Sequence, residues 1–477
     1  MKAPPSMRLD KFFSDSRDHA AAWALALGGA LFYLGCPSYR FNFDGVACAI
    51  AVELGDWRHL AHGNHVLFGV LGRLFFDAWT RLGYHGRALP ALCALDAILG
   101  GAGLAVFFQI LRSLGLAFAE SLIASLGLGV SAAYWIWSLE AQVYPLGVLF
   151  LLLTFRELVK ERPRPFRAAL WHALAVLGHA GHVLFLPAGL WLASRSSVGK
   201  RGAGAYALSL GALLVAGYAA AALFLIHPRS WPDLRIWLLG SAALKVGGEF
   251  HWHFAPGASS LSDWLLAVPR LFADPLDPSR PPEWGWALGF LGAALAALGA
   301  WRLARDAPAR PWAGAVFLWL GAYACLYLSW EPSTLVYRIS DLPPLWVLVV
   351  FGARALSRRA QPLLAALSLG LGLYNGRYLI APFETPSANA SYAQALRLAK
   401  RTPPDAWIIT SGIGSVYIPY FARRKTINRR YYEGRADALA ERIASLLAKG
   451  EPVYWDSGTA AVVRPTAENP RGSGRKN

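Results

Sequence analysis

The sequence has few charged residues for its length. Only 16% of its 477 residues are Asp, Glu, Lys or Arg, whereas 55% are hydrophobic and the mean hydropathy is positive. A water-soluble globular domain usually carries about 25% charged residues. The composition therefore excludes an ordinary soluble protein and favours one that lies mostly in lipid.

Cysteine is scarce as well. The four cysteines show none of the paired spacings of a metal site; they are Cys36, Cys48, Cys93 and Cys325. We interpret them as unpaired apolar residues, with a Cys36–Cys48 disulfide as the alternative if both lie on an oxidising side. No small-residue cleavage motif follows the first apolar run, which argues against a cleaved signal peptide.

Long apolar runs recur over the first 381 residues. Each is near the length that a hydrocarbon core requires, and Trp and Tyr stand at many run ends. The runs are 20–36, 89–111, 122–137, 143–158, 168–192, 203–226, 284–301, 312–330, 342–355 and 363–381. They predict an all-α polytopic membrane protein with about eleven transmembrane helices.

The basic residues give the orientation. The net charge is +17, but Lys and Arg lie between the apolar runs rather than in one patch, so we predict no nucleic-acid partner. Loops rich in Lys and Arg stay cytoplasmic, which places the amino terminus inside and the carboxyl terminus outside. The alternation closes at eleven spans if 168–192 forms two helices that turn near 179–182, and if 66–87 does not cross.

This topology divides the chain into four segments. Residues 1–18 are a cytoplasmic segment, and 466–477 are expected to be disordered. Residues 19–382 form the transmembrane domain, with large outer loops at 37–88 and 227–283. Residues 386–465 are expected to form a small α/β domain outside the membrane, with strands at 405–410, 425–428 and 452–456 and an amphipathic helix at 436–450. The GIG in this domain is too short to indicate a nucleotide loop.

Acidic residues and histidines near membrane depth gather on the predicted outer face. The inner loops offer mainly Arg and Lys. Ionisable residues at the ends of spans are costly to keep, so they indicate a functional site. The outer residues that could carry chemistry are Asp44, His62, His65, Arg81, Arg87, Glu140, His179, His182, His227, Glu331, Tyr337, Arg338 and Asp341, with Glu249, His251 and His253 in GEFHWHFAPG.

Several short motifs over residues 20–200 resemble a known superfamily. An Asp opens the first outer loop in FNFDG, histidines follow in HLAHGNH, and Arg87 precedes Pro90 at the head of the next span. A later span begins SLEAQVYP, and a His-bearing turn reads LGHAGH. This pattern resembles the GT-C membrane glycosyltransferases of the protein O-mannosyltransferase and lipid A aminoarabinose transferase kind. The resemblance implies a GT-C-like fold, a polyprenyl-phosphate sugar as donor and a site on the outer face.

The resemblance also implies roles for two carboxylates. Asp44 matches the catalytic Asp of the first outer loop. Many members carry a second acid directly after it, where this sequence has Gly45. Glu140 stands where several members place a second carboxylate, although one position out of phase.

Transfer from a lipid-linked phosphate requires less acid–base chemistry than glycoside hydrolysis, because phosphate leaves well without protonation. One base for the acceptor hydroxyl, Asp44, then suffices, and direct attack would invert the anomeric centre. Cations such as Arg87 or Arg338 would support the leaving phosphate. His62, His65 and His182 are further candidates for phosphate binding. A divalent metal is a possible cofactor, with no ligand set indicated.

Each candidate also has a structural interpretation. Asp44 could cap the helix that starts at Gly45, and Glu140 could be a charge at the end of a span. Arg338 could pair with Asp341. The histidines could pack at the interface without binding anything.

Two other functions compete with the transferase. A transporter would also hold ionisable groups, but it often shows internal repeats and midplane charges, and neither is evident here. A noncatalytic lipid-binding protein of the same fold is the second alternative, because Gly45 replaces an acid. The predicted partners are a polyprenyl-phosphate sugar, membrane lipids and an acceptor that is protein, lipid or glycan. The predicted location is the bacterial inner membrane.

Overall fold

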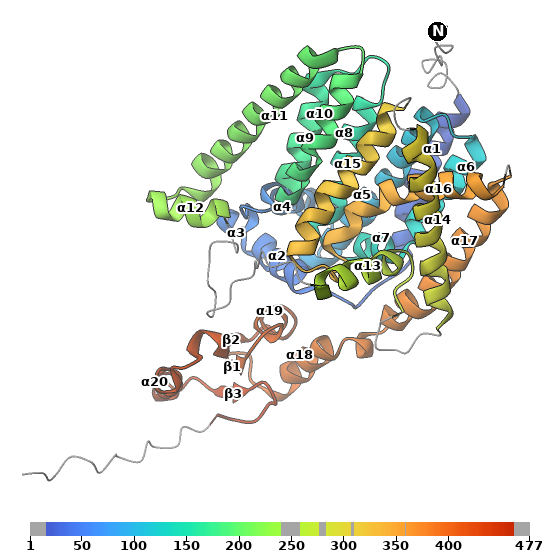
Figure 1. Ribbon diagram of the computed structural model, residues 1–477. Helices are drawn as coiled ribbons and strands as arrows, with labels where there is room; N and C mark the ends of the chain where they lie inside the picture. Colours follow the sequence, from blue (N-terminus) through green and yellow to red (C-terminus); the bar gives the residue numbers. More distant parts are fainter. Residues whose placement is uncertain (1–15, 240–257, 276–282, 307–309, 358, 462–477) are drawn as a thin grey trace, which may run out of the picture. The chain divides into compact units, whose positions relative to one another are not determined.

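The computed structural model describes residues 16–239, 258–275, 283–306, 310–357 and 359–461 (Figure 1). Three predicted features lie outside these residues: most of the amino-terminal segment 1–18, the GEFHWHFAPG motif of the second outer loop, and the tail 466–477. The chain forms two compact units, residues 1–388 and residues 389–477.

The first unit is built from helices (Figure 1). Its α-helices are α1 Ser16–Leu34, α2 Phe43–Leu54, α3 Trp57–Leu60, α4 Val66–Arg81, α5 Ala88–Ser113, α6 Phe118–Val130, α7 Ala132–Leu139, α8 Val143–Leu158, α9 Pro165–Gly178, α10 Leu186–Arg195, α11 Gly199–Ala221, α12 Trp231–Leu239, α13 Ala258–Phe272, α14 Trp284–Asp306, α15 Pro311–Ser329, α16 Leu342–Leu356 and α17 Gln361–Asn375. Tighter or wider turns extend them at η2 Ala180–Phe185, η3 Ala222–Ile226, η6 Tyr337–Asp341, η7 Gly376–Ile380, η8 Ala381–Glu384 and η9 Pro386–Ala388.

Among the described residues, six helical segments are long and apolar enough to cross a membrane. They are Ala88–Ser113, Gly199–Ile226, Trp284–Arg305, Pro311–Ser329, Tyr337–Leu356 and Gln361–Glu384, and the bent pair of α6 and α7 brings the number to seven. The predicted helical membrane architecture is confirmed, but the count of eleven is not. The helix α8, for example, has 16 residues and extends only about 24 Å, less than a hydrocarbon core of about 30 Å.

The run 168–192 divides into two helices, as predicted. The helix α9 ends at Gly178, the turn η2 follows, and α10 begins at Leu186. A methyl group added at Gly202 would approach Pro165, and one added at Gly217 would meet Leu177, so α9 runs parallel to α11. Because only three residues join α10 to α11, these two helices run in opposite directions, which makes α10 antiparallel to α9.

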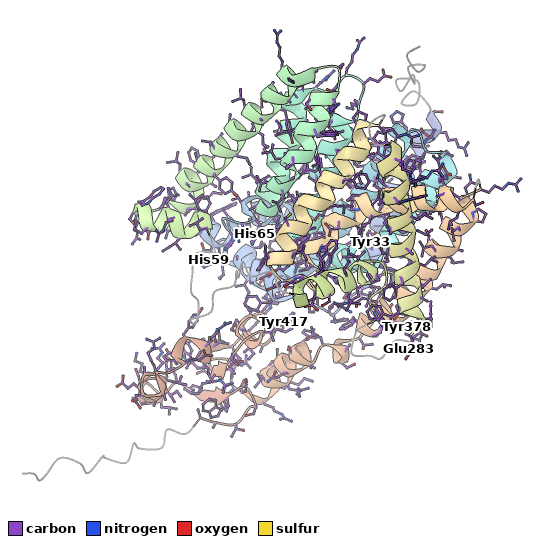
Figure 2. All side chains as sticks on the ribbon, in the orientation of Figure 1. Tyr33, His59, His65, Glu283, Tyr378 and Tyr417 are labelled. Atoms are coloured by element: carbon purple, nitrogen blue, oxygen red, sulfur yellow. The ribbon has the colours of Figure 1, made fainter. Side chains whose placement is uncertain are left out.

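The span that contains α6 and α7 bends by 63° between the two helices. The bend leaves carbonyl groups without partners along the helix, and an apolar environment makes unpaired carbonyls costly. Side chains from other helices bind them: the Tyr33 hydroxyl donates to the Gly129 carbonyl at 3.0 Å, and the Asn375 amide donates to the Val130 carbonyl at 2.8 Å. Tyr33 is buried, and Figure 2 shows it within the helical bundle. These bonds fix the direction of α7 and of the segment that follows it.

The second unit contains a three-stranded parallel sheet in the order β2-β1-β3. The strands are β1 Trp407–Thr410, β2 Lys425–Asn428 and β3 Val453–Trp455, and the helices are α18 Ala390–Arg401, α19 Gly414–Tyr417 and α20 Ala436–Ala448, with turns η10 Ile418–Ala422 and η11 Arg429–Tyr432. A small core of aliphatic side chains joins α20 to the sheet: Ile409, Ile427, Ile443, Leu446 and Val453. The predicted strands and the amphipathic helix are confirmed, whereas α18 was not predicted.

Candidate active site

Asp44 lies in the first turn of α2. The cap of this helix is Asn42, whose side-chain oxygen accepts a hydrogen bond from the Asp44 backbone N–H at 2.8 Å. The interpretation of Asp44 as the helix cap is therefore wrong, and its carboxyl is left for another role. The side chain is exposed and has no ion-pair or hydrogen-bond partner among the described residues. Desolvation by the surrounding protein nevertheless raises the pKa of the Asp44 carboxyl.

Gly45 packs against the segment that follows α7. A methyl group built on Gly45 would lie 2.5 Å from the backbone oxygen of Ala141, which is closer than atoms can approach. The turn that carries Asp44 therefore rests directly on residue 141. This contact explains why a glycine stands where the resemblance leads us to expect a second acid: no side chain fits there.

Glu140 ends α7 in an extended conformation and is buried. Neither of its carboxyl oxygens has a hydrogen-bond partner among the residues that the structure describes. Burial raises the pKa of Glu140 to about 7, and the positive charge of Arg40 opposes this shift. Two residues after Glu140, the backbone N–H of Gln142 donates to the buried Asp96 carboxylate of α5 at 2.6 Å. The predicted second carboxylate is thus held beneath the surface rather than presented to it.

Two tyrosines connect Asp44 to the turn between α15 and α16. The rings of Tyr144 at the start of α8 and Tyr337 in η6 meet edge to face with their centroids 5.8 Å apart. Tyr337 also packs on Trp330 at 4.4 Å, and Tyr144 packs on His179 at 5.1 Å. The Asp44 carboxyl lies within electrostatic reach of both phenol groups. Segments from four parts of the sequence therefore meet here.

The histidines of the first loop meet those of the η2 turn. The His62 and His65 rings stack at 4.6 Å, and the backbone N–H of Ala180 donates to the Asn64 carbonyl at 2.8 Å. Figure 2 shows His65 close to His59 in this part of the unit. Burial is the main cause that lowers the pKa of His65 to about 3 and that of His179 to about 4. These rings are neutral near pH 7 and cannot supply positive charge to a phosphate.

The described histidines and acids of this region are not grouped as metal ligands would be. Within the described ranges, no three His, Cys, Asp or Glu side chains come together in a way that could hold a metal ion. His182 in particular is buried and bonded: its Nδ1 lies 2.7 Å from the Tyr323 hydroxyl, and its Nε2 lies against Gly147 of α8. The geometry therefore favours a structural role for His182 over the predicted contact with phosphate.

The two predicted arginines have carboxylate partners. Arg87 binds Glu53 of α2 through two nitrogens at 3.0 and 2.6 Å, and Glu53 also accepts the N–H of Ala88 at the start of α5. Arg338 is only 1% exposed and donates to Asp341 at 3.1 Å and to the Trp264 carbonyl at 2.8 Å. The pairing of Arg338 with Asp341, the structural interpretation, is confirmed, and the guanidinium is not accessible to a phosphate.

Sequence reasoning did not single out Arg40, and it placed Glu331 on the outer face without assigning it a role. The Arg40 guanidinium stacks on Phe383 at 4.1 Å and donates to the Leu379 carbonyl at 3.3 Å, and its charge acts on Glu140. Its position four residues before Asp44 was an available signal. Glu331 lies within electrostatic reach of Tyr144 and Tyr337, as Asp44 does, but no local motif indicates this proximity.

The sequence matches no model of a known protein family, and no curated protein matches it either. Solved structures do match. The crystal structure of ArnT from Cupriavidus metallidurans bound to undecaprenyl phosphate is similar with a TM-score of 0.62 and 13% identity, over 91% of this chain and 92% of that one. Its apo form gives 0.60 and 12% identity over the same shares of the two chains. The archaeal oligosaccharyltransferase AglB from Archaeoglobus fulgidus, in complex with an inhibitory peptide and a dolichol-phosphate, gives 0.50 and 12% identity, over 87% of this chain and 65% of that one.

At identities this low, the likeness is one of fold. The chain has the fold of the GT-C glycosyltransferases, to which both ArnT and AglB belong. The resemblance found in the sequence motifs is confirmed at this level.

The contact of Gly45 predicts the effect of a single methyl group. We expect Gly45→Ala to lower the free energy of unfolding by about 1–3 kcal/mol, because the Ala141 backbone cannot move aside without shifting the whole segment. Thermal unfolding in lipid nanodiscs would measure the loss. Gly28→Ala in α1 is the matched control, since nothing lies within 4 Å of an added methyl group there. Equal stability of the two variants would contradict the packing described here.

The burial of Glu140 predicts a dependence of stability on pH. Its folded pKa of about 7 exceeds the ordinary value of 4.5, so the folded chain keeps a proton that the unfolded chain releases. The protonated carboxyl does not reduce the free energy of unfolding below pH 4.5. As the pH rises from 4.5 to about 7, this contribution to stability is lost. Glu140→Gln should therefore be more stable than wild type at pH 8, by at most about 3 kcal/mol, and the gain should vanish near pH 4. Thermal unfolding at the two pH values measures this difference, and a variant less stable than wild type at pH 8 would show that the carboxylate has a partner.

Proposed function

We propose that this chain is a membrane glycosyltransferase that moves a sugar from a polyprenyl-phosphate donor to an acceptor on the outer face of the membrane. The observation that carries the proposal is the exposed Asp44 carboxyl, which has no ion-pair partner among the described residues and lies within electrostatic reach of Tyr144 and Tyr337. The fold supports it, because the similar ArnT structure contains undecaprenyl phosphate and the AglB structure contains a dolichol-phosphate.

In this proposal, Asp44 is the general base. It removes the proton from the acceptor hydroxyl while the acceptor oxygen attacks the anomeric carbon of the donor sugar. The bond between that carbon and the phosphate oxygen breaks, and the polyprenyl phosphate leaves with the bonding electrons. The attack is direct, so the anomeric configuration inverts. The desolvation that raises the pKa of Asp44 also makes it a stronger base than an ordinary aspartate.

The leaving phosphate needs cationic support, for which we propose Arg40 and Arg87. Both stand in the first outer loop, at either end of the segment that contains α2 and α4. Arg87 binds Glu53 in the structure, so a phosphate would share or compete for that guanidinium. Charge-assisted bonds from guanidinium to phosphate are strong enough to make this exchange favourable.

The histidines contribute neutral hydrogen bonds in this proposal. His62 Nδ1 accepts the N–H of Asn64 at 3.2 Å, so the neutral ring carries its proton on Nε2. That N–H is a donor suited to a phosphate or sugar oxygen. Arg338, His182 and Glu140 are buried, and we assign them to holding the site in place rather than to contact with substrate.

The acceptor is a hydroxyl group of a protein, lipid or glycan. We place the site on the extracytoplasmic side of a bacterial inner membrane, with the amino terminus in the cytoplasm, because the Lys- and Arg-rich loops alternate with loops that carry the acids and histidines. The small α/β unit lies on the same outer side in this topology.

Replacement of the proposed base tests the function. The full-length protein and its Asp44→Asn variant would be assayed in nanodiscs with a panel of polyprenyl-phosphate sugars and an envelope extract as acceptor. We expect wild type to release polyprenyl phosphate and the Asp44→Asn variant to slow the release by about 10²- to 10⁴-fold, because an amide cannot accept the proton. The kcat/KM of wild type should fall as the pH decreases, with an apparent pKa above the ordinary value of an aspartate.

Asp263→Asn is the control, since Asp263 is an exposed acid on α13. If both variants release polyprenyl phosphate at the rate of wild type, Asp44 is not the base. If no donor of the panel is turned over by wild type, the proposed function itself fails, and a transporter or a lipid-binding protein becomes the better interpretation.

A further inference from the structure

The outer turn between α15 and η6 contains a strained residue. Glu331 has φ +45°, in the left-handed region of backbone conformation that residues other than glycine rarely adopt. The turn holds it there: the Thr334 hydroxyl donates to the Glu331 carboxyl at 3.0 Å, and the Thr334 N–H donates to the Glu331 carbonyl at 3.1 Å. Strain of this kind persists where the surrounding structure requires it, and it is concentrated at functional sites.

The strained turn and the proposed base act on the same two tyrosines. Trp330 packs on Tyr337, and Tyr337 meets Tyr144 edge to face. The carboxyls of Asp44 and Glu331 lie within electrostatic reach of the same two phenol groups, Tyr144 and Tyr337. These four side chains come from the first outer loop, the start of α8 and the turn between α15 and α16.

Three further carboxyls of this region, all in the described part of the chain, are not available to a substrate. Glu140 is buried, and Asp341 is buried against Arg338. Glu53 is paired with Arg87. Glu331, by contrast, is exposed and is bonded only within its own turn by the described contacts. A second acid next to Asp44 in sequence is excluded by the contact of Gly45 with Ala141, whereas Glu331 reaches the same region from another loop.

We propose that Glu331 is a second substrate-binding carboxylate of the site, which accepts a hydrogen bond from a hydroxyl group of the substrate while Asp44 acts as base. This inference rests on the proposed function. A carboxylate repels the donor phosphate but accepts well from hydroxyl groups, so Glu331 lies on the sugar or acceptor side of the reacting carbon. The hydroxyl belongs either to the donor sugar or to the acceptor, and the two sources are separable by experiment.

The test compares Glu331→Gln, Glu331→Gly and the control Glu283→Gln in the full-length protein in nanodiscs. Glu283 is an exposed acid that lies well away from His65 of the first loop (Figure 2). Two reactions are followed for each: transfer to an acceptor, and hydrolysis of the donor by water. Each uses a polyprenyl-phosphate sugar on which wild type is active. Thermal unfolding is measured on the same samples.

We expect Glu331→Gln to lower kcat/KM for transfer roughly 10- to 100-fold, with unfolding as in wild type. If hydrolysis falls equally, Glu331 binds the donor sugar; if only transfer falls and the KM for acceptor rises, it binds the acceptor. Glu331→Gly should be equally impaired yet unfold at a higher temperature than wild type, because glycine adopts φ +45° without strain. If Glu331 were only structural, its replacement would change the unfolding temperature but not the kcat/KM for transfer or for hydrolysis.

Normal transfer and hydrolysis in Glu331→Gln would overturn the inference and leave the proposed function intact, provided that Asp44→Asn is inactive. Loss of activity in Glu283→Gln to the same extent would also overturn it, because the loss would then result from removing any negative charge on that side of the protein. A wild-type protein that turns over no donor would reject both the inference and the proposed function.

Discussion

The site depends on the pairing of backbone groups at the bend between α6 and α7. In lipid, a carbonyl that leaves its helix must find a donor within the protein. At this bend, Tyr33 donates to the Gly129 carbonyl and Asn375 donates to the Val130 carbonyl. The Trp346 ring N–H donates to the neighbouring side-chain hydroxyl of Ser131. They come from three helices that are distant in sequence, so the direction of α7 is a property of the whole bundle rather than of its own residues.

The position of the proposed base follows from that direction. The segment after α7 is extended, and Asp96 of α5 holds it through the N–H of Gln142. Gly45 then rests on Ala141, which orients the first turn of α2 and its Asp44 carboxyl. Buried residues in this chain of contacts fix the geometry, and the exposed ones, Asp44 and Glu331, face the substrate in our proposal. The separation explains how one short segment can carry a buried Glu140 next to an exposed site.

The sequence predicted the features that depend on local pattern. Apolar runs located the helices, the turn around 179–182 separated α9 from α10, and short apolar stretches located the three strands. The loop of Asp44 was singled out because its motif is contiguous, and the role of Asp44 as a base stays a prediction. Features that depend on distant partners were not predictable: the bend that Asn375 binds, the burial of Glu140 and the approach of Glu331 to Tyr144.

The most direct test of the account is to locate a bound donor phosphate. A cryo-electron microscopy structure of the full chain in nanodiscs with a polyprenyl phosphate would show where the head group lies. The account predicts phosphate density on the face that carries Asp44, within hydrogen-bond distance of Arg40 or Arg87. Density for the phosphate at the opposite end of the helices, next to the Lys- and Arg-rich loops, would contradict it.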